Sequence, residues 1–116
     1  GYPLWMQGER DARYPEAGRM YTQNFQKLIH RIRRDLKTPD LPIFCGQINP
    51  PPVKFPAVEI VRNAQAMTAK KTHNVKLIST DGLGKRGDQV HYNFAGQIEL
   101  GKRFATAYLE MIEQGL

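Results

Sequence analysis

The sequence predicts an α/β domain with a parallel sheet covered by helices on both faces. Three short apolar runs typical of buried strands, at residues 3–6, 41–48 and 74–79, alternate with longer helical patterns. This alternation indicates right-handed crossovers and parallel strand pairing. The length of 116 residues and the hydrophobic share of 41% allow one such domain, or part of one, but not two.

The first helical pattern covers about residues 16–37. The run from His30 to Arg34 contributes much of the formal net charge of +6, and we expect it on the solvated outer face of the helix. Thr38 ends the helix, because a residue that precedes proline is disfavoured in the helical region. Apolar residues recurring at helical steps define the predicted buried face: Phe25, Leu28, Ile29, Ile32 and Leu36.

Two further helices are predicted, separated by loops. Residues 49–52 contain three consecutive prolines and mark a surface loop. The second helical stripe follows it and consists of Ala57, Val58, Ile60, Val61, Ala64 and Met67. Residues 80–92 are rich in Gly and Asp and are predicted to be a loop, and Asn93 is a suitable N-cap for the last helix. That helix runs from Phe94 to about Glu113, and its predicted buried side comprises Phe94, Ile98, Phe104, Ala105, Tyr108 and Ile112.

Composition limits the function classes. No run approaches the roughly 20 apolar residues of a membrane span, so no membrane partner is predicted. The 17 Lys and Arg exceed the 11 Asp and Glu, but aromatic residues are not interleaved with them, and nucleic acid is not predicted as a partner. The single cysteine, Cys45, lies in an apolar run and is predicted to be a buried thiol. The compartment is undetermined, and secretion or periplasmic export through an upstream signal peptide is compatible with the sequence.

The loops that follow parallel strands form the crevice of such sheets, and two of them carry reactive groups. One holds residues 7–11, and the other holds Asp88 and His91 directly before the last helix. An Asp and a His at this spacing can point the same way, so that the carboxylate binds one imidazole nitrogen while the other takes a proton. This would be two thirds of a catalytic triad. An Asp and a His at this spacing are common by chance, however, and the spacing by itself favours an exposed loop pair.

Four motifs occur in one order along the chain: Trp5 to Asp11, Arg62 with Gln65, Ser79 to Leu83, and Asp88 to Gln97. Together they resemble the sialate O-acetylesterase-like and acetylxylan esterase group, carbohydrate esterase family six, of the SGNH hydrolase superfamily. The resemblance extends from Trp5 to about Leu109. It implies a three-layer αβα, flavodoxin-like SGNH hydrolase fold, of which residues 1–116 are the C-terminal part.

The resemblance implies a serine ester hydrolase that removes acetyl groups from carbohydrate hydroxyls and needs no metal or organic cofactor. His91 matches the general base, and Asp88 matches the acid that orients it. Gln7 and Gly8 match a block that contributes to the oxyanion hole, with the Gln7 amide as donor. Glu9, Arg62 and Gln65 match positions that hold the loops, although a surface ion pair is an alternative interpretation.

The departure from this group is large, because the blocks that carry the serine nucleophile and a glycine oxyanion donor are absent. Ser79 is the only serine, and its place at a strand end favours a structural role. Either the chain is a fragment of a longer protein, which we favour, or a separate polypeptide completes the sheet. The alternative hypothesis is a non-catalytic carbohydrate-binding or interaction module on the same scaffold.

Three other features carry weaker signals. His30 and His73 have no Cys or carboxylate at ligand spacing, so we predict surface histidines and no metal site. The glycines at 82, 84 and 87 match a dinucleotide-binding spacing, but no helix or ribose-binding acid follows at once, and we reject this hypothesis. Trp5 could stack on a sugar ring, but a core position at a strand end is favoured.

Overall fold

The computed structural model describes residues 2–115 as strands and helices in alternation. The elements are β1 (Leu4–Trp5), the 3₁₀ helix η1 (Asp11–Arg13), α1 (Pro15–Arg19), α2 (Tyr21–Asp35), β2 (Ile43–Gly46), α3 (Val58–Lys71), β3 (Val75–Ile78) and α4 (Phe94–Glu113). Each predicted strand and helix is thus present, with shorter strands than the apolar runs indicated. Within these residues no helix is both long enough and apolar enough to cross a membrane.

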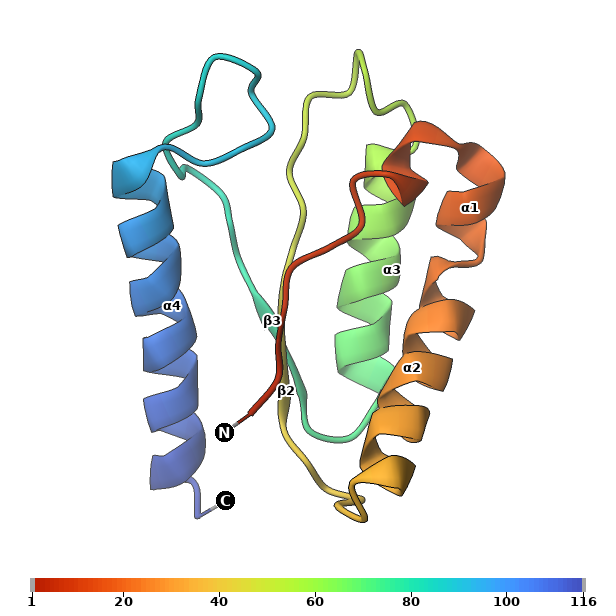
Figure 1. The fold of residues 1–116 in the computed structure, drawn as a ribbon, viewed down its shortest axis with the longest axis vertical. Helices are drawn as coiled ribbons and strands as arrows, with labels where there is room; N and C mark the ends of the chain where they lie inside the picture. The colour runs from red at the N-terminus through yellow and green to blue at the C-terminus, as the bar shows by residue number, and fades with distance from the viewer. Residues whose placement is uncertain (1, 116) are drawn as a thin grey trace.

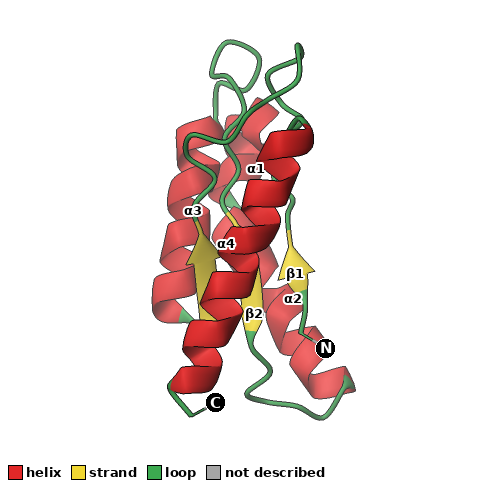
Figure 2. Ribbon diagram, turned by 90° about the vertical axis from the view of Figure 1, so that its left-hand side faces the viewer, coloured by secondary structure: helices red, strands yellow, loops and turns green. Residues whose placement is uncertain are grey.

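The three strands form one parallel sheet in the order β1-β2-β3. Leu4 pairs with Phe44, and Ile43 pairs with Val75, so β2 is the central strand. Helix α4 covers one face of the sheet, while α1, α2 and α3 lie on the other (Figure 1). The edge-on view shows the same sandwich (Figure 2). The predicted three-layer αβα architecture is therefore confirmed.

The core has two parts because successive side chains of β2 point to opposite faces of the sheet. Ile43 and Cys45 pack with residues of α2 and α3, whereas Phe44 packs with Phe104 and Met111 of α4. Cys45 is fully buried, as predicted. Burying a side chain as large as Phe stabilises the fold by about 1.5–3 kcal/mol. Each of the two clusters contains such a residue, and their burial holds the helices on the two faces of the sheet.

The region predicted as one helix from 16 to 37 differs from the expectation in three ways. It is broken at Met20 into α1 and α2. Leu36 lies beyond the end of α2 and is 61% exposed, so its assignment to the buried face was wrong. Arg33 is buried, although the run from His30 to Arg34 was expected in solvent. Its guanidinium reaches the backbone carbonyls of Leu41 and His73, which compensate the burial.

The buried side of α4 was largely predicted wrongly. Phe104 is buried as expected, but Ala105, Tyr108 and Ile112 are exposed, as are Phe94 and Ile98. The sheet instead contacts a second stripe at helical spacing, formed by Leu100, Phe104, Ala107 and Met111. Apolar residues follow helical spacing on more than one side of α4, and the three described strands cover only one side. Met67 of α3 is likewise exposed rather than buried.

Candidate active site

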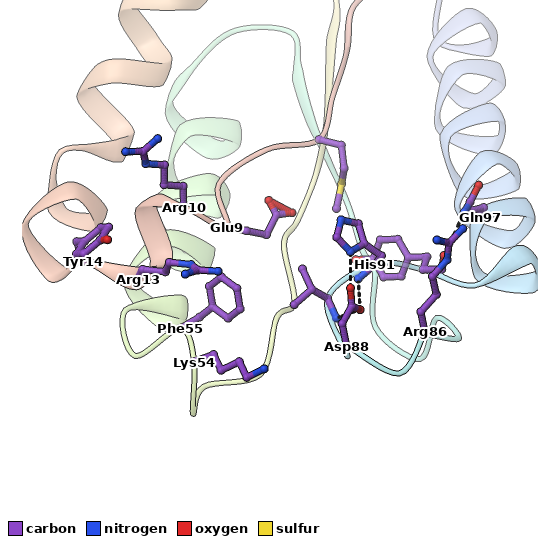
Figure 3. A pocket seen from close by; sticks show the side chains of 13 residues that line it. Glu9, Arg10, Arg13, Tyr14, Lys54, Phe55, Arg86, Asp88, His91 and Gln97 are labelled. Atoms are coloured by element: carbon purple, nitrogen blue, oxygen red, sulfur yellow. Dashed lines mark hydrogen bonds and ion pairs between the residues drawn. The ribbon is translucent and has the colours of Figure 1, made fainter.

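A cavity of about 1000 Å³ lies at the carboxyl end of the sheet, where the loops after all three strands meet. Met6 and Glu9 follow β1, Lys54 and Phe55 follow β2, and the segment with Asp88 and His91 follows β3. Figure 3 shows these side chains converging from separate loops. Parallel strands place the ends of their loops at one edge, which is why distant parts of the sequence meet here.

Asp88 and His91 form a hydrogen-bonded pair in this cavity. The His91 Nδ1 and Asp88 Oδ2 atoms are 2.5 Å apart. The other carboxylate oxygen, Oδ1, accepts hydrogen bonds from the backbone N–H groups of Val90 at 2.9 Å and His91 at 3.0 Å. The bond to His91 and these two backbone bonds hold the pKa of Asp88 well below its usual value of 3.8. Nε2 of His91 has no hydrogen-bond partner within residues 2–115 and is available to a substrate.

The loop that presents this pair is tied to the start of α4. Gln89 adopts a positive φ of 61°, which lets the chain turn between Asp88 and His91. The Arg86 N–H donates to the His91 carbonyl at 2.8 Å and closes the loop. Asn93 caps α4 through a 2.8 Å bond from the Gly96 N–H to its side chain, as predicted. His91 is therefore held two residues before the N-cap of α4.

Gln7 and Gly8 lie beside the cavity rather than in its lining. The Gln7 side chain donates to the Asp11 carboxylate at 3.1 Å and accepts from the Tyr21 hydroxyl at 3.3 Å. Gly8 has a φ of 140°, and an added Cβ would lie 3.1 Å from Val61. Its positive φ favours glycine, and a side chain here would also press against Val61. For the Gln7 amide to meet an oxyanion in the cavity, its side chain must exchange these hydrogen bonds.

Gln65 joins three segments behind the cavity. It is fully buried on α3, and its Oε1 accepts from the Ile48 N–H at 3.0 Å. Its Nε2 donates to the Gln7 carbonyl at 2.9 Å and to the Tyr21 hydroxyl at 3.2 Å. Burial raises the pKa of Tyr21 to about 12, so its hydroxyl stays a neutral donor to the Gln7 carbonyl. Gln65 thus fixes the loops after β1 and β2 against each other.

Arg62 links the loops after β2 and β3. Its Nη1 donates to the Ile48 carbonyl at 2.7 Å, and its Nη2 lies 3.4 Å from the Asp81 carboxylate. A second carboxylate, that of Glu59, lies 3.8 Å from Nε. Arg62 does not line the cavity, whereas Glu9, which was grouped with it from the sequence, does. In the view of Figure 3 the Glu9 carboxylate lies between Arg10 and Arg13 on one side and the Asp88–His91 pair on the other.

Basic residues of the lining were missed by sequence reasoning. Arg10, Arg13, Lys54 and Arg86 line the cavity, and Glu9 and Asp88 are its acidic residues. The Arg13 guanidinium lies 4.9 Å from the centre of the Phe55 ring, an arrangement that favours a fixed position. Their positions in the segments that follow the predicted strands were a usable signal, but only the folded chain shows that they share one cavity.

Among the described residues, no serine, threonine or cysteine lines the cavity. The single serine, Ser79, follows β3 outside the lining, and its hydroxyl accepts a 3.2 Å bond from the Asp81 N–H. Burial raises the pKa of the Cys45 thiol to about 12, so its reactive thiolate does not form near neutral pH. Residues 2–115 contain no group of three or more His, Cys, Asp or Glu side chains arranged to bind a metal.

Comparison with known proteins gives the family. Residues 3–110 match the model of a family described as "Carbohydrate esterase, sialic acid-specific acetylesterase". The chain belongs to this family. The match confirms the resemblance to SGNH-type carbohydrate esterases on which the site prediction was based.

Relatives of this chain support the assignment to the family. A protein of Arabidopsis thaliana described as a probable carbohydrate esterase is 34% identical over 106 residues, which are 91% of this chain but 39% of that protein. The crystal structure of an Arabidopsis protein of the same locus superposes with a TM-score of 0.87 at 33% identity, covering 94% of this chain and 44% of the other. The chain therefore spans less than half the length of these relatives.

A more distant structure shows the same fold. A carbohydrate esterase family 3 protein from Talaromyces cellulolyticus has a TM-score of 0.72 at 16% identity, covering 97% of this chain and 59% of that one. At this identity the likeness concerns the fold alone. The chain thus has the predicted α/β architecture.

Proposed function

We propose that this chain supplies the acid–base half of a serine-dependent carbohydrate O-acetylesterase. The observation that carries the proposal is the Asp88–His91 pair, 2.5 Å apart, in a cavity at the carboxyl end of a parallel sheet. The family assignment supports it by naming an acetylesterase of an acidic sugar. The nucleophilic serine would come from a segment outside these 116 residues, for which the greater length of the relatives leaves room.

In the proposed mechanism His91 moves the protons. Its Nε2 takes the proton of the serine hydroxyl while the serine oxygen attacks the acetyl carbonyl and forms a tetrahedral oxyanion. The imidazolium then protonates the departing sugar oxygen, and water releases acetate from the acyl-enzyme by the same route. Asp88 holds Nδ1 protonated and stabilises the imidazolium, and its lowered pKa keeps it ionised for this role.

The neighbouring residues have supporting roles in this proposal. Gln65 and Arg62 fix the loops that carry the reacting groups, because each binds the backbone at Ile48 and a second loop. Gln7 and Gly8 would contribute to the oxyanion hole after the Gln7 side chain turns from Asp11. The excess of basic residues in the lining favours an acetylated sugar that carries a carboxylate.

The test is turnover of p-nitrophenyl acetate and an acetylated sugar by the polypeptide that includes the whole serine-bearing region. We expect His91→Ala to lower kcat by a factor of about 10³ or more, the usual cost of losing a triad member. His30→Ala is the matched control, because His30 is an exposed histidine outside the candidate active site. Turnover that survives His91→Ala would contradict the proposal, and sugar binding without turnover would support the module hypothesis.

A further inference from the structure

A second cavity, of about 720 Å³, lies at the end of the molecule opposite the candidate active site. It is formed where α2 and α3 end, immediately before β2 and β3 begin, and so lies at the amino ends of the strands. Figure 1 shows these helix ends and connections at the bottom of the molecule, away from the loops that form the active-site cavity. Neither the proposed mechanism nor the family assignment gives this cavity a role.

The lining of this cavity is basic. Six of its residues are His30, Arg33, Arg34, Lys37, Lys71 and His73, and no Asp or Glu of the described chain is among the others. Arg34 is paired with Asp35 at 3.1 Å, and His73 with Asp40 at 3.3 Å. Lys37 and Lys71 have no salt-bridge partner within residues 2–115. A cleft lined by one sign of charge concentrates the field and attracts ions of the opposite sign.

Arg33 distinguishes this cavity from a patch of surface lysines, because its side chain is buried and hydrogen-bonded. It is 7% exposed, and its Nε and Nη2 donate to the carbonyl oxygens of Leu41, His73 and Asn74 at 2.6 to 3.4 Å. Within residues 2–115, Nη1 has no hydrogen-bond acceptor, and Arg33 has no carboxylate partner. A buried guanidinium that backbone carbonyls hold in place, with the N–H groups of Nη1 unbonded, can donate to an oxyanion.

The basic residues of this cavity lie at the C-terminal ends of α2 and α3, where positive charge also complements the negative ends of the helix dipoles. Several terminal carbonyls of α2 are, however, already bonded: Thr38 N–H donates to the Arg33 carbonyl at 2.9 Å, and Lys37 N–H donates to that of Arg34 at 3.1 Å. The Thr72 N–H similarly caps the Thr68 carbonyl at 2.9 Å. Dipole compensation therefore does not account for the unused Arg33 Nη1 or for the two unpaired lysines.

We propose that this cavity binds a phosphate or sulfate group, with Arg33 as a fixed donor and Lys37 and Lys71 as mobile cations. The proposal does not depend on the esterase activity. The group can be a free anion or can be carried on a sugar, and the cavity volume of about 720 Å³ has room for either. The two sources share the same tetrahedral oxyanion and are separated by the choice of probe.

The experiment titrates the full chain with inorganic phosphate, glucose 6-phosphate and glucose at constant ionic strength, with chloride as the reference anion. Amide chemical shifts at Lys37 and Thr72 and the rise in Tm report binding. We expect Lys71→Gln to weaken phosphate binding about twofold to fivefold, as for the loss of an exposed charge pair. Lys70→Gln is the matched control, because it removes the same charge one residue away, outside the lining.

Lys37→Gly separates binding from folding. Lys37 has a φ of 54°, which glycine adopts more readily, so this variant should unfold at a higher temperature yet bind phosphate more weakly. Tighter binding of glucose 6-phosphate than of phosphate would identify a sugar-borne group, and equal or weaker binding would identify the free anion. The proposal is overturned if phosphate acts no more strongly than chloride, or if Lys70→Gln weakens binding as much as Lys71→Gln does.

Discussion

Asp88 shapes its own loop and also holds the ring of the neighbouring His91. Its Oδ1 accepts two backbone N–H groups and sets the turn, while its Oδ2 holds the His91 ring. The turn requires an unfavourable backbone conformation at Gln89, since its φ of 61° is unusual for a residue other than glycine or asparagine. The spacing in the sequence therefore corresponds to a local structure in which the imidazole can face only a narrow range of directions.

The pKa of Asp88 leads to a prediction at this scale. Because it lies below 3.8 in the folded chain, the stabilisation by ionised Asp88 is complete above that pH. It is lost only as the pH falls through the lowered value. We expect the carboxylate to remain ionised at pH values where ordinary aspartates are half protonated, and carboxyl ¹³C shifts measured by NMR during an acid titration will check this.

Asp88→Asn extends this prediction to activity. The amide oxygen can still accept the two backbone bonds, but the negative charge beside His91 is removed. We expect the loop to stay folded and kcat to fall by up to about 10⁴-fold, the loss known for the equivalent change in a serine protease triad. A fall of less than about tenfold, with the loop intact by NMR, would show that Asp88 does not orient a catalytic base.

At the scale of elements, α4 connects the loop that carries Asp88 and His91 to the sheet. Gly84 and Gly96 let the loop and the first turn of α4 meet closely: a Cβ on Gly96 would lie 2.2 Å from the Gly84 carbonyl oxygen. The Asn93 N–H donates to that same carbonyl at 3.0 Å. The position of His91 thus depends on a backbone contact that no side chain at residue 96 can permit.

A pair of glycine variants tests this junction. Gly96→Ala must displace backbone, so we expect a loss of about 1–3 kcal/mol in the free energy of unfolding and reduced esterase activity. Gly101→Ala, in the same helix, meets no atom within 4 Å and should stabilise the protein by up to about 1 kcal/mol. Chemical denaturation will measure both. Equal effects of the two changes would contradict the role given to the Gly84–Gly96 contact.

At the scale of the whole molecule, an apolar surface remains uncovered. Leu4 on the edge strand β1 is 63% exposed, and Ile112 of α4 is 45% exposed. Tyr2 lies beside Tyr108, with ring centres 5.4 Å apart, so the start of the chain and α4 are neighbours. An edge strand with unpaired backbone groups next to exposed apolar side chains favours association with another polypeptide.

We therefore expect the 116-residue chain, in isolation, to self-associate. Replacing Leu4 and Ile112 together by lysine should shift it towards the monomer in sedimentation velocity runs, because both changes place charge on the uncovered surface. Leu36→Lys is the control, since Leu36 is equally apolar and 61% exposed but lies beyond the end of α2. A chain that is monomeric at every concentration, or that responds equally to Leu36→Lys, would contradict the expectation.

The sequence alone determined the α/β class, the order of strands and helices, the Asn93 cap and the buried Cys45, because these follow from local periodicity and backbone chemistry. It could not determine which stripe of α4 meets the sheet, because apolar residues follow helical spacing on more than one side and only the neighbouring strands select between them. The burial of Arg33 was also missed, because the carbonyls that accept its hydrogen bonds belong to residues 41 and 73, which are distant in sequence.

In the candidate active site, too, some features follow from the local sequence and others only from the tertiary structure. The Asp88–His91 pair is local, so its spacing and the family resemblance were enough to predict it. The cavity around it is not local: Arg13, Lys54 and Arg86 come from three different loops and meet only because parallel strands end at one edge. The buried network of Gln65, which joins α3 to two loops, likewise needs contacts between residues far apart in sequence, and only the tertiary structure decides those.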